Sequence, residues 1–563
     1  MKWGKIPEPQ IENVKKLSNV LGVSDIVSKL LIQRGINNFD SAKDYFRPEW
    51  NHLYNPFLMK DMQIAVDRIK QAIDKNEKVM ILGDYDVDGT TSVSLIISYL
   101  NDKITDLKPY IPDRYSEGYG ISDRAIDYAN SEGVNLIIAL DCGIKAVEKV
   151  KYASSLGIDF IICDHHMPEE ILPNAVAVLD PKRTDCNYPF KDLCGCGIGF
   201  KLVQAINNHL GLSDSELIIY LDLVATAIAA DVVPLVGENR TLMFLGLKQL
   251  RENPRLGFKI FIKDLTRPIN VSDLAFIVAP RINAAGRMDH GINAVKLMTS
   301  KDQKAVLSIA RTIEFFNTER KSTEERITNE ALQQIKLEDI TKNYSTVVYH
   351  SSWHKGVIGI VASRLIEHYY RPTVVLTKSE DLMVGSVRSV HGFDVYEALE
   401  ACKQHIFQFG GHKYAAGLTL NTEQLNPFKE AFETYVSKNL SPELKEPEIK
   451  YDLEVEFSDL NSKLLRIINQ MRPFGPKNTN PVFATHNCRD SGSSRLVGSD
   501  KTHLRLDVLD SNQTHFQGIG FGLGHMLKKV KETDTFSILY TLDENHYNGT
   551  VNLQFKLRDI NFN

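Results

Sequence analysis

The sequence predicts an α/β protein whose largest domain is a mostly parallel sheet with helices on both faces. From about residue 60 onwards, short apolar runs such as "KVMIL", "VNLIIAL" and "IDFIIC" alternate with helix-like stretches. This alternation is typical of parallel sheets, because each crossover between parallel strands needs a helix-length connection. The chain has 563 residues, and that length accommodates about three or four domains, each with its own core.

Five segments are expected along the chain. Residues 1–58 read as short amphipathic helices, residues 59–300 as the parallel-sheet domain, and residues 301–340 as a connecting helix, since Gly and Pro are absent between Gly291 and Gly356. The apolar stripe of that helix fades near residues 317–326, which we interpret as a helix crossing solvent between domains. Residues 341–440 read as a smaller α/β domain. After a proline-containing, charged linker at 440–450, residues 447–563 read as a small β-barrel or sandwich.

Composition limits the function classes. The formal net charge is −5, so any nucleic-acid binding has to come from local basic patches rather than from a global positive field. The seven cysteines form no CxxC pair and no signal-peptide pattern opens the sequence, so we expect free thiols in a cytoplasmic protein. Residues 217–236 imitate a membrane span, but Asp222 and Asp231 favour a buried helix, and no membrane association is expected.

Acidic side chains and histidines follow several of the apolar runs. After "VMIL", "LIIAL", "FIIC" and "VATAIAA" come, in order, Asp84, Asp86 and Asp88; Asp141; Asp164, His165 and His166; and Asp231. In an open parallel sheet, ligands bind outside the carboxyl ends of the strands. We therefore expect these residues, distant in sequence, to converge at one edge of the sheet.

Six carboxylates at one sheet edge could not all stay ionised without compensating cations. A pair of divalent ions would supply that compensation. Oxygen and imidazole ligands favour Mg²⁺ or Mn²⁺ over structural zinc, and the imidazoles favour Mn²⁺. Two such ions roughly 3.5–4 Å apart are a common device for in-line hydrolysis of a phosphodiester. The sequence thus predicts a two-metal site.

Three other interpretations explain less of the sequence. An EF-hand loop starting at Asp84 would need Glu at its twelfth position, where Leu95 stands. An aspartyl-phosphate phosphatase would use Asp86 as a nucleophile, but it leaves "DHH" and Asp141 without a role. The string "CGCGIG", residues 194–199, is not a dinucleotide fingerprint, because Phe200 stands where the last glycine belongs. We expect a tight loop near the site there.

The ordered motifs "DYDVDG", "LDCG", "DHH" and "ADVVPL" resemble those of the DHH phosphoesterase superfamily. Later strings, among them "PDRYSEGYG", "APRINAAGRMDH", "WHKGVIGIVASR", "GSVRS" and "FGGHKYAAG", are similar to the bacterial RecJ single-stranded-DNA exonucleases. The resemblance implies a DHH domain, a long helix, a DHH-associated domain and an OB-like barrel. It also implies Mn²⁺- or Mg²⁺-dependent 5′→3′ degradation of single-stranded DNA to mononucleotides, in DNA repair and recombination.

The resemblance assigns roles to individual residues. The implied metal ligands, which are also the catalytic residues, are Asp84, Asp86, Asp88, Asp141, His165, His166 and Asp231. Asp164 would orient a histidine. The implied phosphate-binding residues are Arg114, Arg281, Arg287, Ser386, Arg388, Gly411 and His412; arginine suits this role because its planar fork binds phosphate oxygens in pairs. A single-strand-binding protein and a helicase are candidate partners.

Two features depart from or add to this resemblance. Ala227 and Ile228 stand where the family usually has a Gly-Thr pair, from which we expect altered packing rather than a lost ion. In the barrel, Phe474, Phe483, Phe516, Phe521 and Arg505 could contact a single strand, but aromatic residues in a small barrel are more often core, so no role is assigned to them.

Two other functions stay open at this stage. The chain could be a small-substrate DHH phosphodiesterase that cleaves cyclic dinucleotides or short RNAs, although such an enzyme needs no barrel. It could also be a DNA-binding scaffold that has lost catalysis, although a scaffold has no reason to keep so many mutually repelling carboxylates.

Overall fold

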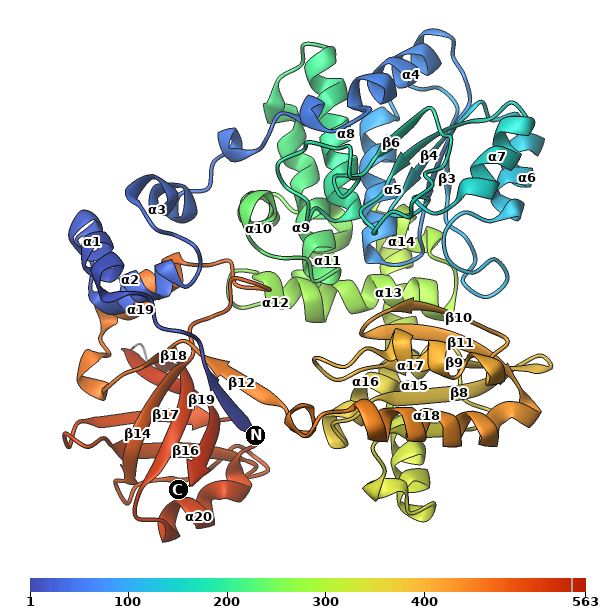
Figure 1. Ribbon diagram of the computed structural model, residues 1–563. Helices are drawn as coiled ribbons and strands as arrows, with labels where there is room; N and C mark the ends of the chain where they lie inside the picture. Colours follow the sequence, from blue (N-terminus) through green and yellow to red (C-terminus); the bar gives the residue numbers. More distant parts are fainter. Residues whose placement is uncertain (548–549, 563) are drawn as a thin grey trace.

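The structure is a computed structural model that describes residues 1–547 and 550–562. Figure 1 shows three lobes: a large α/β lobe at the top, a smaller α/β lobe at the lower right, and an all-β lobe at the lower left. The N-terminal segment runs alongside the all-β lobe before it enters the large lobe. The predicted fold class, a parallel-sheet domain with a smaller α/β domain and an all-β barrel, is confirmed.

The large lobe is built on five parallel strands in the order β3-β2-β4-β5-β6. Alternate side chains of the strands enter two different cores: Val79 and Ile81 pack on one face of the sheet, and Met80 and Leu82 on the other. The sheet is therefore buried on both faces, which explains its continuous apolar runs. The strands are β2 (Val79–Gly83), β3 (Leu107–Tyr110), β4 (Leu136–Leu140), β5 (Asp159–Cys163) and β6 (Ala177–Leu179).

Helices cover both faces of this sheet. One face packs against α4 (Met62–Asp74), α5 (Val87–Leu100) and α8 (Gly195–His209), and the other against α6 (Asp123–Ser131) and α7 (Val147–Ser155). The remaining helices of the lobe extend the first core; they are α9 (Leu221–Ala230), α10 (Gly237–Glu252), α11 (Leu256–Ile262), α12 (Val271–Asp273), α13 (Ala279–Met288) and α14 (Ile292–Thr299).

The N-terminal segment contains the predicted short helices, α1 (Ile11–Leu21), α2 (Asp25–Ile32) and α3 (Phe39–Phe46). It also contains a strand that was not expected, β1 (Lys2–Lys5). β1 pairs in parallel with β12 (Glu448–Tyr451), which lies at the end of the stretch expected to be a linker. The first residues of the chain therefore form a two-stranded sheet with the segment that connects the two smaller lobes.

The connecting helix is α15 (Gln303–Leu337), and its buried face changes character along its length. The face is apolar up to Ile313 and again from Ile327, but between them it presents Asn317, Arg320 and Glu324. These three side chains are 1%, 8% and 8% exposed. The interpretation of this stretch as crossing solvent is wrong, because its polar residues are enclosed by protein.

The smaller α/β lobe has a five-stranded sheet in the order β10-β11-β9-β8-β7, in which only β7 and β8 are parallel. Its strands are β7 (Thr346–Tyr349), β8 (Thr373–Ser379), β9 (Leu382–Arg388), β10 (Gln408–His412) and β11 (Ala415–Asn421). The helices α16 (Ile358–His368), α17 (Val395–Ala401) and α18 (Leu425–Asn439) complete the lobe.

The all-β lobe is a seven-stranded sheet that curls until β14 and β16 also pair. Phe483 lies in its core, whereas Phe521 is 56% exposed. Its strands are β13 (Leu453–Glu454), β14 (Phe483–Asp490), β15 (Arg495–Val497), β16 (His503–Leu509), β17 (His515–Gly520), β18 (Phe536–Tyr547) and β19 (Thr550–Phe562), and its helices are α19 (Ser462–Gln470) and α20 (Leu527–Glu532).

Two further findings concern the whole described chain. None of its helices combines the length and the apolar character that crossing a membrane requires. All seven cysteines are buried and free, as expected for thiols.

Candidate metal centre and phosphate site

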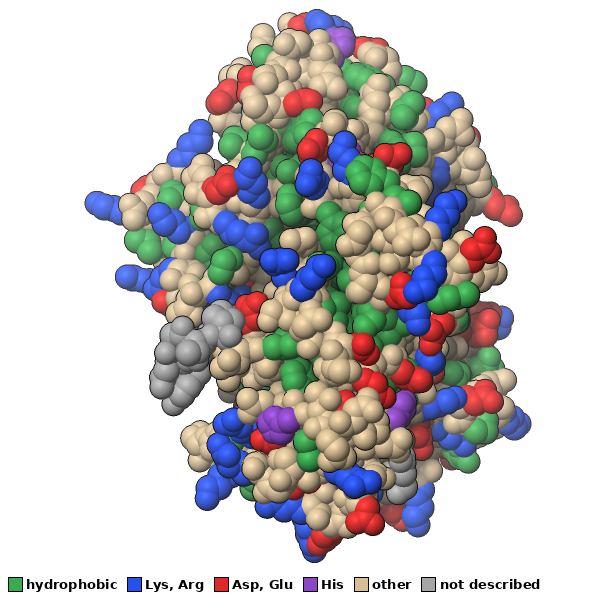
Figure 2. Space-filling view, turned by 90° about the vertical axis from the view of Figure 1, so that its left-hand side faces the viewer, with side chains coloured by type: hydrophobic (Ala, Val, Ile, Leu, Met, Phe, Trp, Pro, Cys, Tyr) green, Lys and Arg blue, Asp and Glu red, His purple; other side chains and the backbone are tan. Residues whose placement is uncertain are grey.

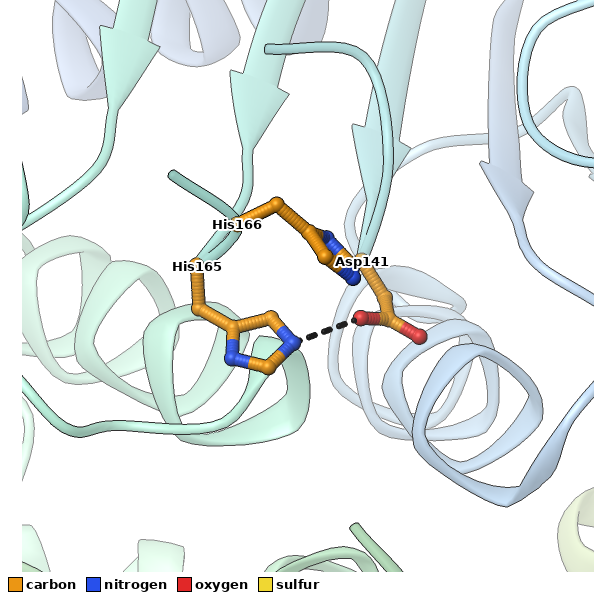
Figure 3. Close-up of side chains that lie close together, drawn as sticks. All are labelled: Asp141, His165 and His166. Atoms are coloured by element: carbon orange, nitrogen blue, oxygen red, sulfur yellow. Dashed lines mark ion pairs between the residues drawn. The ribbon is translucent and has the colours of Figure 1, made fainter. Parts of the chain in front are cut away.

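Polar residues from four segments of the large lobe meet at one edge of its sheet. Asp84 follows β2, Asp141 follows β4, and His165 follows β5, while Asp231 directly follows α9. Figure 3 shows the rings of His165 and His166 beside the carboxylate of Asp141, beyond the ends of two neighbouring strands. The predicted convergence at the carboxyl ends of the strands is therefore present in the structure.

His165 lies at the centre of this cluster. Its Nε2 is 3.2 Å from Asp141 Oδ1, 3.8 Å from Asp88 Oδ2 and 3.8 Å from Asp231 Oδ2. Three carboxylates thus surround one imidazole nitrogen at distances a single cation could bridge. His166 forms a second group of candidate ligand atoms with Asp141 and His165, all within 4.8 Å of one another.

The first residues of α8 hold the carboxylate of Asp88 in place and pack closely against Asp141. The backbone N–H groups of Gly195 and Cys196 donate to Asp88 Oδ2 and Oδ1 at 2.6 and 2.7 Å. A Cβ atom on Gly195 would lie 2.6 Å from Asp141 Cβ, so only glycine lets the helix approach this closely. The expectation of a tight loop at 194–199 is wrong: the segment does lie near the site, but it begins a helix, whose N-terminus favours negative charge.

Asp86 and Asp164 form hydrogen bonds with groups two or three residues away in the chain. Asp86 is the N-cap of α5 and accepts a hydrogen bond from the Gly89 backbone N–H at 3.1 Å. Asp164 is buried, and its Oδ1 is 2.8 Å from His166 Nδ1. Although burial opposes it, the hydrogen bond from His166 lowers the pKa of Asp164, so the carboxylate is ionised and His166 donates through Nδ1. The Nε2 of His166 is then left to act as a ligand.

Burial and the charges of neighbouring groups shift the pKa values of Asp88, Asp141, His165 and Asp231. Burial, followed by the charge of Asp86, raises the pKa of Asp88 to about 7. Burial and Asp88 raise the pKa of Asp231 to about 8, and burial with its acidic neighbours raises that of Asp141 well above its ordinary value. Burial lowers the pKa of His165 to about 3, which keeps its imidazole neutral. Bringing these carboxylates together without a cation is therefore unfavourable.

The residues fit divalent cations. Oδ1 of Asp84 is buried and has no hydrogen-bond partner among the described residues, so it is an acceptor that needs a positive group. The donor set around His165 consists of carboxylate oxygens and imidazole nitrogens, which suit Mn²⁺ or Mg²⁺. The nearby thiols of Cys142 and Cys163 are held protonated, because burial raises their pKa values.

Three of the predicted phosphate-binding arginines gather beside the acidic cluster. The guanidinium of Arg114 lies 4.6 Å from the ring centroid of Tyr85, and Arg287 donates to the Gly356 carbonyl at 3.0 Å. Arg388 donates to Ser386 Oγ at 3.0 Å. None of the three arginines forms an ion pair with a carboxylate in the described part of the chain. They leave a positive site open to an anion.

Arg281 takes a different place. It lies on α13, and its Nε donates to Glu314 on α15 at 2.6 Å while its Nη1 donates to the Ile277 carbonyl at 2.8 Å. The charges of Arg114 and Arg388, after burial, lower the pKa of Arg287, so these three guanidinium groups lie near one another. The structure therefore groups Arg114, Arg287 and Arg388 with Ser386 but gives Arg281 a carboxylate partner of its own.

The smaller lobe reaches the acidic cluster through β10. The ring of His412 stacks on that of His166, with centroids 6.4 Å apart and planes 16° apart. Gly411 has φ +147°, and a Cβ atom there would lie 2.5 Å from the Ala415 carbonyl oxygen, so glycine is required at this close strand contact. The site is consequently shared between two lobes.

Two residues near the site were not predicted. Gly359 lies in the first turn of α16, beside Arg388, and a Cβ atom there would lie 2.9 Å from both Arg388 Nη2 and Ser386 Oγ. The string "KGVIGI" could have indicated it. Lys182 donates to the His165 carbonyl at 2.5 Å and stands close enough to lower the pKa of Asp231. Nothing in the sequence singles out Lys182.

Comparison with known proteins identifies the lobes. The sequence profile of the DHH family N-terminal domain matches residues 78–228, that of the DHHA1 domain matches residues 341–438, and that of the RecJ OB domain matches residues 451–559. The single-stranded-DNA-specific exonuclease RecJ of Bacillus subtilis is 36% identical over 564 residues, which cover 99% of this chain and 70% of that protein. The chain belongs to the RecJ family.

Other members of the RecJ family are similar over comparable lengths. The RecJ exonuclease of Escherichia coli is 30% identical, over 89% of this chain and 90% of its own length. The crystal structure of RecJ from Thermus thermophilus in complex with Mn²⁺ has the same fold, with a TM-score of 0.86 at 24% identity, covering 99% of this chain and 79% of that one. An exonuclease RecJ bound to manganese matches with a TM-score of 0.60 at 29% identity, covering 68% of this chain and 95% of that chain.

The two residues at which we expected a departure from the family motif, Ala227 and Ile228, lie inside α9. Ala227 and Ile228 are 0% and 1% exposed and belong to the core of the large lobe. Asp231, one turn later, keeps its carboxylate 3.8 Å from His165 Nε2. The substituted pair is therefore accommodated by apolar packing while the acidic residue stays in the cluster.

Proposed function

We propose that this protein is a metal-dependent exonuclease that degrades single-stranded DNA from its 5′ end to mononucleotides. The observation that carries the proposal is the placement of an acidic, histidine-containing cluster beside three arginines that have no carboxylate partner among the described residues. Cations held by the first group and a phosphate held by the second would lie next to each other. Similarity to RecJ exonucleases over nearly the whole chain supports the same activity.

The ligands divide into two groups in this proposal. Asp88, His165 and Asp231 would surround one ion and Asp141, His165 and His166 a second, with Asp84 and Asp86 as further carboxylate ligands. When bound, two divalent cations supply Lewis-acid activation of a water molecule and neutralise the charge that develops on the phosphodiester. The pairing with Asp164 fixes the ring of His166, and the N-terminus of α8 fixes Asp88.

The arginine site would bind and orient the end of the DNA. Arg114, Arg287 and Arg388 present guanidinium groups to a phosphate, with Ser386 as a further donor. Once the 5′ end is held there, the first internucleotide phosphate falls beside His166 and His412, at the boundary of the two lobes. Because the arginine site would hold the end of a strand rather than an internal nucleotide, the enzyme would be an exonuclease.

The all-β lobe supports a single-stranded substrate, because OB folds bind single strands in cationic grooves. Figure 2 shows the face that carries this lobe and the N-terminal helices: Lys and Arg side chains gather across its middle, on a surface otherwise of mixed sign. Such local patches offset a net charge of −5. A role in DNA repair and recombination in the cytoplasm, with a single-strand-binding protein and a helicase as partners, completes the proposal and rests on the family alone.

The test uses a 5′-phosphorylated single-stranded DNA of about forty nucleotides, long enough to span several OB-type binding sites. A matching duplex and a cyclic dinucleotide serve as comparison substrates. The purified protein and its Asp141→Ala variant are each incubated with Mn²⁺, with Mg²⁺ and with chelator. We expect mononucleotides from the 5′ end of the single strand only, and none from the variant or in chelator.

Other outcomes would redirect the proposal. Cleavage of the cyclic dinucleotide alone would make the protein a small-substrate phosphodiesterase. DNA binding without cleavage under either metal would make it a scaffold.

A further inference from the structure

One residue beside the metal centre has an unfavourable backbone conformation. Val232 has φ +58°, which lies in the left-handed region. There the Cβ atom of an L-residue comes too close to the following carbonyl oxygen, and a β-branched side chain is accommodated least well. Among the non-glycine residues with positive φ that the structure describes, Val232 is the only β-branched one.

The path of the chain explains the φ angle but not the choice of valine. Asp231 is the C-cap of α9, so Val232 occupies the next position, where a helix commonly ends in a left-handed residue that is usually glycine. Beyond it Val233 and Leu235 are buried, and the Leu235 backbone N–H donates to the Pro476 carbonyl at 2.7 Å. The backbone therefore has to turn at residue 232, and glycine would turn there without strain.

Packing within the protein does not explain the valine either. Val232 is 64% exposed, so little of its side chain is buried against the core. A single exposed valine is unremarkable on its own, but one that also strains the backbone is not offset by apolar burial. Strain of this kind is found at active sites, where the residue concerned has a role in function. The side chain of Val232 therefore needs a contact that the folded chain does not supply.

Val232 lies at the opening of the acidic cluster. Asp88, Asp141 and His165 are the enclosed members, with side chains 1%, 4% and 9% exposed. Asp231 and His166 are the open members, at 29% and 30%. A substrate that reaches the cluster has to enter past these two residues. Because Val232 directly follows Asp231 in the chain, it forms part of the rim of this opening.

We propose that Val232 is a substrate-binding residue whose side chain packs against the sugar and base of the nucleotide at the metal centre. Cations and arginines bind the charged oxygens of a phosphodiester, whereas the sugar and base of the same nucleotide present apolar surface. Valine offers methyl groups to that surface and glycine does not. The inference rests on the proposed exonuclease activity and adds a residue that contacts the uncharged part of the substrate.

The experiment measures stability and steady-state kinetics of Val232→Gly and Val232→Asn. Glycine and asparagine both accept the left-handed conformation, so the melting temperature of each variant should rise, by about 1–3 °C. Neither variant keeps the methyl groups, so KM for single-stranded DNA should rise about 5–20-fold, as for losing part of a buried valine side chain. The value of kcat should stay within about twofold, since such a contact is made equally in the ground state and the transition state.

A second substrate separates the two apolar parts of the nucleotide. The 5′-terminal nucleotide of this strand lacks its base but keeps its sugar. If Val232 packs on the base, wild type and Val232→Gly should have similar KM values for the abasic strand. If Val232 packs on the sugar, the ratio of their KM values should match that for the intact strand.

Two controls separate this role from a structural one. Glu380→Gly is the matched variant, because Glu380 is exposed and has φ +55° in the turn between β8 and β9, at the end of β9 opposite Arg388. It should raise the melting temperature without changing KM. The affinity of Val232→Gly for Mn²⁺, measured by calorimetry, should equal that of wild type, since the carboxylate of Asp231 is unchanged.

Three results would count against the inference, and a fourth concerns the proposed function. A wild-type KM in Val232→Gly would show that the side chain does not contact DNA. A fall in melting temperature would show that the valine stabilises the fold, and a matching loss of Mn²⁺ affinity would show that it positions Asp231. If wild type cleaves no single strand, the exonuclease proposal itself fails.

Discussion

His412 of the smaller lobe stacks on His166 of the large lobe, with ring centroids 6.4 Å apart. This contact places a side chain of one lobe against a candidate metal ligand of the other. Burial, followed by the charges of His166, Lys145 and Lys182, lowers the pKa of His412, so it is neutral near pH 7 and can donate one hydrogen bond. A neutral donor at this place suits an oxygen of the phosphate being cleaved.

The stacking predicts that His412→Ala impairs turnover without removing a metal ion. We expect kcat/KM on single-stranded DNA to fall about 10–100-fold, because a hydrogen bond to a charged phosphate is lost. The number of Mn²⁺ ions bound, measured by calorimetry, should not change. His405→Ala is the control, since His405 contacts Gln424 away from the site. A loss of one bound ion in His412→Ala would instead make His412 a ligand.

The close approach of Gly195 to Asp141 leads to a second prediction, about a substitution at the start of α8. In Gly195→Ala the new Cβ atom would meet Asp141 Cα and Oδ1 at 2.9 Å, so helix and carboxylate must move apart. We expect weaker Mn²⁺ binding and a loss of about 1–3 kcal/mol in the free energy of unfolding, as for overpacking.

The matched control for this change is Gly197→Ala, two residues further along the same helix. There the nearest atom would be Leu193 Cδ2 at 3.3 Å, the end of a flexible side chain. Equal Mn²⁺ affinity in the two variants would show that the approach of α8 to Asp141 is unimportant for the ion.

The strand-end residues could be placed from sequence because parallel strands bring their carboxyl ends to one edge. That rule needs only the apolar runs and the residues directly after each run, so it located Asp84, Asp141 and His165 together. Asp231 joins them from the end of a helix, α9, which the rule does not cover. The rule carries no information about the elements that pack on the edge. The N–H groups of Gly195 and Cys196 went unnoticed because their N-cap is Cys194, which is not among the usual capping residues.

The burial of three polar residues on α15, Asn317, Arg320 and Glu324, could not be predicted for a different reason. In sequence, a buried polar layer and a solvated stretch look alike, since both break the apolar periodicity. Only the neighbours brought by α13 and α16 show that Arg320 and Glu324 are enclosed. The same holds for Arg281, whose partner Glu314 lies 33 residues away on another helix.

The acidic cluster predicts how stability depends on pH when no metal is supplied. In the folded protein the pKa of Asp88 is about 7 and that of Asp231 is about 8, whereas the ordinary value is 3.8. As pH rises above about 4, the unfolded chain releases protons that the folded protein still holds. The free energy of unfolding of the metal-free protein should therefore fall between about pH 4 and pH 8.

Mn²⁺ should reverse this trend, because cations bind the deprotonated carboxylates. The measurement is the melting temperature at pH 5, 6, 7 and 8, in chelator and in Mn²⁺. We expect the difference between the two curves to widen as pH rises, and to widen less in Asp231→Asn. A difference that stays constant with pH would contradict a proton-coupled site.

The contacts of Arg240 indicate how the all-β lobe is positioned. This arginine of α10 is buried, lies 3.9 Å from the ring centroid of Tyr45, and donates to the carbonyls of Tyr45, Arg472 and Pro473. Burial lowers its pKa to about 10, and it has no carboxylate partner among the described residues. It therefore joins the large lobe, the N-terminal segment and the all-β lobe through neutral acceptors alone.

Arg240→Ala should consequently loosen the all-β lobe while leaving the acidic cluster intact. We expect a destabilisation of about 2–4 kcal/mol, since several buried carbonyls lose their donor. We also expect a rise in KM for a forty-nucleotide strand, with little change in kcat on a tetranucleotide too short to reach that lobe. The exposed Arg466→Ala serves as the control. If long and short strands are affected equally, the contribution of Arg240 is to the stability of the fold rather than to the placement of the lobe on DNA.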